Sequence, residues 1–308
     1  MDTPAAILTV KAYLERWLEA KVKQLKESTW VEYRRVVNHV LIPKFGALAL
    51  IDLKRAHVKE WLVGLEVTNK RLLNLQSIFR SALQDAVNDD ILEINPLHGW
   101  TYRNRDVIKE DDDVDPFTAD EQAAILKAAE GQFKNLIQFA LWSGLRTSEM
   151  VGLDWSAVDF DAGVVTVSKV KTQKSKNMEV PKTRGSARKV KLLAGAVEAL
   201  QAQKQHTFLG RAEVFQDPRW LRRWTGDQPI RNMWLKTLKA AEVRYRRPYQ
   251  TRHTYASMML SSGEPPQWVA AQLGHTSTQM ITRTYGRFMP EALPDAGSRA
   301  DALFRKTS

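Results

Sequence analysis

Apolar residues recur at helical spacing through the first hundred residues of the chain. In the first of these segments Leu14, Trp17 and Leu18 share one face, and Thr9 stands where an N-terminal cap belongs. The expected helices are a first one among the apolar residues that recur from Leu8 to Val22, and then 29–41 (between a Ser28 cap and Pro43), 55–65, and 69 to the Asn95-Pro96 pair (after a Thr68 cap). Four amphipathic helices with short links predict a small helical bundle over residues 1–100.

Strand signals enter only beyond residue 116, among further helices. Alternating apolar residues at 164–167, 178–180 and 188–192 predict strands of one small sheet, with a turn at 183–187. The expected helices cover 118–129 (with a Thr118–Glu121 capping box), 133–143, 146–153, a segment from Gly195, a long one after Pro248, and 268–273, which ends at Gly274. The predicted fold class is mainly α with a small antiparallel β-sheet.

A charged stretch separates the two halves of the chain. Residues 101–116 lack apolar periodicity and end at Pro116, and within them residues 107–116 hold one lysine against five acids. Such a stretch is typical of a linker. We therefore expect one domain over residues 1–100 and a second over residues 117–308.

Composition excludes several kinds of site and of protein. With 308 residues, 44% of them hydrophobic, the chain can bury a sizeable core in two domains. The absence of cysteine excludes disulfides, thiolate metal sites and a cysteine nucleophile. The sequence also lacks the HExxH spacing of a metal site. The acidic start Met1-Asp2 is a poor signal peptide, and no apolar stretch approaches the roughly 20 residues of a membrane span. These features predict a soluble cytoplasmic protein.

The net charge of +11 is concentrated in the second domain, where residues 117–308 hold 29 Lys and Arg against 17 Asp and Glu. A basic domain gains affinity for a polyanion by releasing phosphate counterions. Solvated helix faces on an ordinary protein would give the same composition. Charge alone therefore leaves the partner open.

Four separated residues suggest a phosphoryl-transfer site. Arg146 is followed by Arg252, by His275 23 positions later, and by Tyr285 10 positions after that. A guanidinium can donate two parallel hydrogen bonds to two oxygens of one phosphate, and a tyrosine can act as a covalent nucleophile. Glu149, three residues after Arg146, is placed to hold its guanidinium, although an exposed local ion pair would look the same. Five other histidines are interpreted as structural or solvated: His39, His57, His98, His206 and His253.

The local motifs around these residues resemble those of the tyrosine recombinases, in particular the phage integrases. The matching segments are Arg146-Thr-Ser-Glu149, Tyr249-Gln-Thr-Arg252-His-Thr, Leu273-Gly-His275 and Tyr285. The resemblance covers almost the whole chain. It implies a helical core-binding domain and a mixed α/β catalytic domain that clamp duplex DNA, with four protomers joining two recombination sites.

The resemblance also implies roles for single residues. Tyr285 would attack the scissile phosphate to give a 3′-phosphotyrosine, without metal or other cofactor. Arg146 and Arg252 would stabilise the transition-state charge, His275 would add a hydrogen bond, and Glu149 would orient Arg146.

The general acid is less obvious, because the stretch from Lys169 to Lys191 holds nine basic residues, both ends included. We expect Lys182, which precedes the turn of the strand-turn-strand segment, with Lys171 and Lys174 as the alternatives. The other basic residues are interpreted as contacting DNA phosphates or solvent. Tyr249 stands where the family commonly has histidine, and a phenol with a pKa near ~10 is a poor base at neutral pH. The base for Tyr285 is therefore left open.

Other functions remain as alternatives. The chain could be a catalytically silent DNA-binding relative, or a nicking enzyme like the type IB topoisomerases. The arm-binding domain of many phage integrases is missing, because the protein lacks it or because the chain was trimmed. Residues 290–308 carry a sparse apolar stripe that would pack on its own domain or dock on a neighbouring protomer. DNA-bending accessory proteins are possible partners; the target site and the direction of recombination are not encoded in the motifs.

Overall fold

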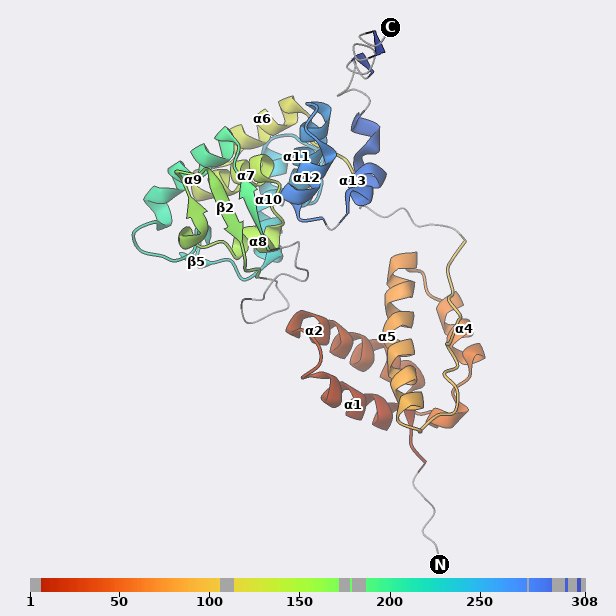
Figure 1. Cartoon of the computed structure of the whole chain (residues 1–308). Helices are drawn as coiled ribbons and strands as arrows, with labels where there is room; N and C mark the ends of the chain where they lie inside the picture. The colour runs from red at the N-terminus through yellow and green to blue at the C-terminus, as the bar shows by residue number, and fades with distance from the viewer. Residues whose placement is uncertain are drawn as a thin grey trace, which may run out of the picture. The chain divides into compact units, whose positions relative to one another are not determined.

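The computed structural model describes residues 7–105, 114–171, 178, 187–275, 277–289, 297, 298, 304 and 305 (Figure 1). It divides the chain into two compact units, Met1–Asp113 and Val114–Ser308. None of the helices in these described ranges combines the length and apolar character that a bilayer crossing requires. Lys174, Lys182 and most of the tail over 290–308 lie outside the described residues.

The first unit is a helical bundle, as the spacing of apolar residues predicts. Thr9 and Thr68 cap their helices, each accepting a backbone N–H at 3.2 Å from Ala12 and Arg71. The buried face of α1 (Val10–Lys21) includes Leu14 and packs with α5 (Asn69–Asn88) in one apolar core. The elements are α1 (Val10–Lys21), α2 (Glu27–Val36), the π-helix η1 (Val37–Leu41), α3 (Ile42–Phe45), the 3-10 helix η2 (Leu50–Asp52), α4 (Arg55–Val63) and α5 (Asn69–Asn88).

The second predicted helix is wrong at both ends. It begins at Glu27, with Lys26 rather than Ser28 as the cap residue, and Pro43 does not stop it. A turn of π-helix at Val37–Leu41 precedes the proline, which then occupies the first turn of α3. Backbone N–H groups in the first turn of a helix have no acceptor within it, so a proline there loses no hydrogen bond and the helical backbone continues past it.

Residues 101–105 continue along α5. Gln76 accepts the backbone N–H of Tyr102 at 2.8 Å and donates to the Tyr102 carbonyl at 2.9 Å. Asn69 makes the same exchange with Asn104 at 2.8 and 3.1 Å. These side chains satisfy the backbone of a segment that has no secondary structure of its own. The domain limits at residues 100 and 117 stay a prediction.

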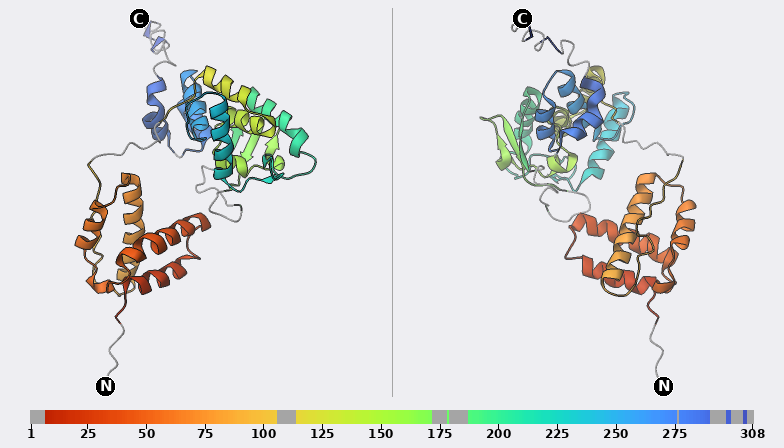
Figure 2. Two further views of the ribbon diagram at one scale, coloured as in Figure 1. Left: turned by 180° about the vertical axis from the view of Figure 1, so that it is seen from behind. Right: turned by 45° about the vertical axis from the view of Figure 1, so that its right-hand side comes forward.

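The second unit combines helices with small antiparallel sheets, which confirms the predicted fold class (Figure 2). β1, β2 and β3 form one sheet in which Val165 pairs with Val158 and Val190. The Thr118–Glu121 capping box is present. The described elements are α6 (Ala119–Ala128), α7 (Gly131–Ser143), α8 (Thr147–Val151), η3 (Trp155–Ala157), β1 (Val158–Asp159), β2 (Val164–Val167), β3 (Arg188–Lys191), α9 (Ala194–Thr207), β4 (Gln216–Asp217), β5 (Arg222–Arg223), α10 (Asp227–Ala240), α11 (Gln250–Ser261), α12 (Pro266–Leu273), α13 (Thr278–Tyr285) and η5 (Gly286–Phe288).

Three of these strands were not expected. β1, β4 and β5 have two residues each, too few for an alternating pattern to show in the sequence. The predicted strand at 178–180 and the turn at 183–187 fall mostly outside the described residues: Met178 belongs to no strand and Ala187 lies in a bend.

The candidate site is positioned by the close approach of α7 to α11. α11, α12 and α13 share a core that includes Tyr255, Leu273 and Tyr285. Gly144 ends α7 with φ +64°, and a Cβ at this position would stand 2.5 Å from Cδ1 of Tyr255. Only glycine combines this backbone conformation with so close a neighbour. The start of α8, which carries Arg146, is thereby held against α11.

Candidate active site

Arg146 is the cap residue of α8 and is held by Glu149. Its Nη1 donates to Glu149 Oε1 at 2.7 Å, and its backbone N–H donates to Oε2 at 2.9 Å. Nη1 also lies 3.4 Å from the carbonyl oxygen of Leu273, so the same guanidinium contacts the end of α12. About 30% of the Arg146 side chain is exposed, whereas Glu149 is buried. The predicted contact is present, and it is a buried carboxylate that directs a partly exposed guanidinium.

Arg188 is the second arginine on Glu149, and sequence reasoning missed it. Its Nη1 and Nη2 donate to the two carboxylate oxygens at 3.0 and 3.1 Å, and its Nε donates to the Gln272 carbonyl at 2.6 Å. Only 7% of its side chain is exposed, so the expectation that it contacts DNA or solvent is wrong. Burial alone would raise the pKa of Glu149, but the hydrogen bond from Arg188 and the charges of Arg188, Arg146 and Arg252 lower it.

Arg252 is almost completely buried, with 1% of its surface exposed. Its Nη1 donates to the Gly144 carbonyl at 2.8 Å and its Nη2 to the Leu273 carbonyl at 2.6 Å. Its Nε–H has no acceptor among the described residues. Burial, with the charges of Arg146 and Arg188, lowers the pKa of Arg252 to about 10, so the group is still a cation at neutral pH. A buried cation bonded mainly to neutral carbonyls is costly unless an anion joins it.

His275 lies beside this guanidinium. Its Nε2 is 3.0 Å from Arg252 Nη2, and because a guanidinium only donates, Nε2 accepts and the ring proton of the neutral form sits on Nδ1. That Nδ1 is buried and has no partner among the described residues. Burial and the neighbouring arginines lower the pKa of His275 to about 4. The residue is half-buried.

Tyr285, the last residue of α13, is 1% exposed and points its hydroxyl at His253. The Tyr285 Oη–His253 Nδ1 distance is 2.8 Å. Burial raises the pKa of Tyr285 to about 12, against the opposing charge of Arg252. His253, interpreted from the sequence as structural or solvated, therefore contacts the hydroxyl of Tyr285. Its position directly after Arg252 on the same helix was the available signal, but the contact forms only when α13 folds back on α11.

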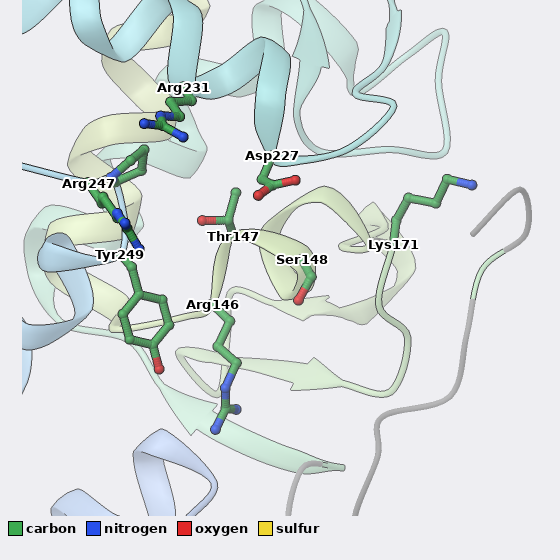
Figure 3. A pocket seen from close by; sticks show the side chains of 9 residues that line it. Arg146, Thr147, Ser148, Lys171, Asp227, Arg231, Arg247 and Tyr249 are labelled. Atoms are coloured by element: carbon green, nitrogen blue, oxygen red, sulfur yellow. The ribbon is translucent and has the colours of Figure 1, made fainter. Parts of the chain in front are cut away.

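Tyr249 and Arg146 both line a cleft of about 470 Å³ (Figure 3). Tyr249 is 41% exposed, and its ring meets the His253 ring edge to face at 5.0 Å between centroids. Lys171 lines the same cleft, but its ammonium points away from the guanidinium of Arg146 in Figure 3. The remaining lining residues are Thr147, Ser148, Asp227, Arg231, Arg247 and Pro248.

The described site thus brings together residues from four elements. α8 supplies Arg146 and Glu149, and α11 supplies Arg252 with Tyr249 at its N-terminal end. His275 follows α12, and Tyr285 ends α13. Lys182 and Lys174 are outside the described residues, so the choice of general acid stays a prediction.

Known proteins resemble both halves of the chain. The phage integrase family matches residues 116–290, and the phage integrase N-terminal SAM-like domain matches residues 9–65. The prophage integrase IntR of Escherichia coli K12 is 31% identical over 88% of this chain and 67% of its own length. The putative defective protein IntQ of the same strain is 29% identical over 92% of this chain and 80% of its own length.

Solved structures share the fold. The Tn1549 transposon integrase in complex with a circular intermediate DNA is 20% identical, with a TM-score of 0.76 over 90% of this chain and 95% of that chain. A lambda integrase tetramer bound to a Holliday junction is 16% identical, with a TM-score of 0.69 over 88% of this chain and 78% of that chain. Because one family model matches more than half of the chain, the protein belongs to the phage integrase family and is a site-specific tyrosine recombinase that acts on DNA.

Proposed function

We propose that Tyr285 cleaves one strand of a recombination site by attacking the scissile phosphate. The P–O5′ bond breaks as the bond between Tyr285 Oη and phosphorus forms, which leaves a 3′-phosphotyrosine and a 5′-hydroxyl. Attack by the 5′-hydroxyl of a partner strand would release Tyr285 and join the exchanged strands. The energy of the phosphodiester is kept in the protein–DNA bond throughout, so the reaction needs no nucleotide.

One observation carries this proposal: two side chains in contact, Arg252 and His275, each hold a buried donor without an acceptor among the described residues. Arg252 Nε–H and His275 Nδ1–H lack partners among the described residues, and Nη2 of Arg252 contacts the other ring nitrogen of His275. A phosphate would supply oxygen acceptors to both donors and a charge to the buried guanidinium. Arg146, which lines a cleft and contacts the same Leu273 carbonyl as Arg252, would bind a further non-bridging oxygen.

These contacts support differential stabilisation of the transition state. The non-bridging oxygens gain charge when phosphorus becomes pentacoordinate, and donors fixed by the fold need no rearrangement at that moment. Arg252 is fixed by the carbonyls of Gly144 and Leu273, and Arg146 by Glu149. His275, neutral near pH 7 because its pKa lies at about 4, would donate a hydrogen bond without carrying charge.

The departing 5′-oxygen needs a proton, and we assign its donor to Lys182. The assignment rests on the place of Lys182 in the predicted strand-turn-strand segment, which ends six residues later at Arg188 on the Glu149 carboxylate. Lys171 and Lys174 are the alternatives. The direction of the Lys171 side chain, away from Arg146, favours Lys182 over that alternative.

The finer account of partners is also a proposal. Lambda integrase binds a Holliday junction as a tetramer, and we propose that four copies of this chain assemble likewise on two duplex sites in the cytoplasm, to integrate or excise a mobile element. Residues 1–100 would act as the core-site binding domain, and DNA-bending proteins would help assembly. The tail over 290–308 would link neighbouring protomers.

Covalent trapping tests the proposal. A half-site duplex from the end of the element that encodes the chain is nicked near the cleavage position, so that the cleaved strand diffuses away and the protein–DNA adduct accumulates. The wild-type protein should form an adduct that survives denaturation, and Tyr285→Phe should bind the same DNA without forming one. Tyr255→Phe, which changes another buried tyrosine of the same core, is the control and should still form the adduct.

Two results would overturn the assignment. An adduct formed by Tyr285→Phe would show that another residue is the nucleophile. Tight binding of the half-site by the wild-type protein without any adduct would favour the catalytically silent alternative.

A further inference from the structure

His253 contacts the reacting atom of the proposed nucleophile. Its Nδ1 is 2.8 Å from Tyr285 Oη, a hydrogen-bond distance, and the two rings are 5.7 Å apart between centroids. His253 lies on α11 directly after Arg252, so one helix turn supplies both a phosphate-binding group and a neighbour of the tyrosine hydroxyl. This contact requires one of the two groups to donate and the other to accept.

The surroundings of the hydroxyl favour the phenol as donor. Tyr285 is 1% exposed, and burial raises its pKa to about 12, so the hydroxyl keeps its proton near pH 7. A neutral imidazole whose proton sits on Nε2 accepts at Nδ1. Attack on phosphorus requires the phenol to lose that proton, and Nδ1 is the acceptor already in contact with it.

Tyr249 occupies the family's usual histidine position but is poorly suited to accept the proton. A phenol at neutral pH is itself an acid rather than a base. Its ring instead meets the His253 ring edge to face at 5.0 Å. This packing fixes the plane of the imidazole, so Tyr249 supports His253 without taking part in proton transfer.

We propose that His253 is the general base that activates Tyr285, an inference that rests on the proposed nucleophilic role of Tyr285. In the cleavage step the proton moves from Tyr285 Oη to His253 Nδ1 while Oη bonds to phosphorus. The electron pair of the P–O5′ bond goes to the 5′-oxygen, which takes a proton from the general acid. In the rejoining step His253 returns its proton to the leaving tyrosine.

The test compares two side chains that place a hydrogen-bond acceptor at the same position. In His253→Asn the amide Oδ1 takes the place of Nδ1 and accepts a hydrogen bond, but it cannot take a proton. At pH 7 this variant should bind the nicked half-site like the wild-type protein and form the adduct about 10²-fold or more slowly. His57→Asn is the matched control, because His57 Nδ1 also accepts a hydrogen bond, from the backbone of Lys54 in the other unit. It should form the adduct at the wild-type rate.

Two further measurements separate proton transfer from structural damage. The wild-type rate should rise with pH and level off once His253 is neutral, whereas the His253→Asn rate should keep rising, because hydroxide must then remove the proton. Among the described residues, Tyr249 and Tyr285 contact His253 and His275 interacts with it electrostatically, and these titratable groups influence the pH at which the wild-type rate levels off. A fluorinated, more acidic tyrosine at position 285 should restore much of the rate of His253→Asn and change the wild-type rate little.

Each outcome has one meaning. Adduct formation by His253→Asn within threefold of the wild-type rate, or no rescue by the fluorinated tyrosine, overturns the role of His253 as a base. Either result leaves Tyr285→Phe inactive, so the proposed nucleophile would stand. An adduct formed by Tyr285→Phe would remove the nucleophile itself and, with it, the basis of the inference.

Discussion

Arg188 and Glu149 form a bidentate ion pair that joins β3 to α8. Both guanidinium nitrogens lie about 3 Å from a carboxylate oxygen, at 3.0 and 3.1 Å, and both side chains are buried. The same carboxylate holds Arg146 at 2.7 Å. One buried acid therefore fixes a phosphate-binding arginine and the strand that follows the proposed general-acid segment.

Removing that charge should destabilise the protein. Glu149→Gln leaves the buried Arg188 guanidinium without a counter-ion, and breaking a buried pair in this way costs about 3–5 kcal/mol. We expect a loss of that size in the free energy of unfolding, measured by urea denaturation, together with slower adduct formation. Glu32→Gln, at a less buried carboxylate that binds Arg35 and Arg71, is the control and should cost about 1 kcal/mol or less. An equal, small loss in both variants would contradict the prediction.

His275 should make stability fall in mild acid. Burial, then Arg252, Arg146 and Arg188, lowers its pKa from 6.5 to about 4 in the folded protein. Between these values the unfolded chain binds a proton that the folded chain does not, so the free energy of unfolding decreases as pH falls from 6.5 towards 4. Above pH 7 the contribution is constant.

The measurement is a comparison with a variant that cannot titrate. His275→Gln should lose less stability than the wild-type protein between pH 7 and pH 5, and the two should change in parallel between pH 7 and pH 8. Carboxylates that titrate in the same range affect both proteins, and the difference removes them. Parallel curves across the whole range would mean that His275 keeps its ordinary pKa in the fold.

The parts of the fold that were predictable depend on local signals. Thr9, Thr68 and the Thr118–Glu121 pair mark helix starts because a cap bonds to backbone only three residues away. Gly144 marks a helix end because its conformation suits glycine. The prediction that a helix stops before Pro43 was wrong. A π-helical turn precedes the proline and the helical backbone continues past it, but this turn leaves no local sequence signal.

The parts of the site that were missed depend on contacts between distant segments. The Arg146–Glu149 pair spans three residues, and helix geometry alone predicts it. Arg188 reaches Glu149 across 39 residues, and His253 reaches Tyr285 across 32. In the sequence, Arg188 and His253 cannot be distinguished from ordinary surface residues, because each contact forms only when two elements pack together. Burial of a polar side chain, which reveals its role, is a property of the tertiary fold.

Tyr249→Phe should have a small effect. The substitution keeps the ring that packs on His253 and removes only the hydroxyl, so the loss should be that of one hydrogen bond, about 0.5–1.5 kcal/mol or up to roughly tenfold in cleavage rate. Tyr249→Ala should lose more, because the imidazole of His253 then loses its packing partner. Single-turnover rates on the nicked half-site measure both. A loss in Tyr249→Phe as large as that in His253→Asn would make the phenol a participant in proton transfer.

The identity of the general acid should follow from the leaving group. If Lys182 protonates the 5′-oxygen, Lys182→Ala should lose roughly 10²–10⁴-fold in cleavage rate. A substrate with sulfur at the bridging 5′ position leaves as a thiolate, which needs little protonation, so it should restore much of the rate. The same substrate should not rescue Tyr249→Phe or His253→Asn, because their defects lie in the nucleophile's half of the reaction. Lys171→Ala and Lys174→Ala are the matched controls: each removes one positive charge from the same basic stretch and should show only weaker DNA binding. Rescue of either of these variants by sulfur, with none for Lys182→Ala, would move the acid to that lysine.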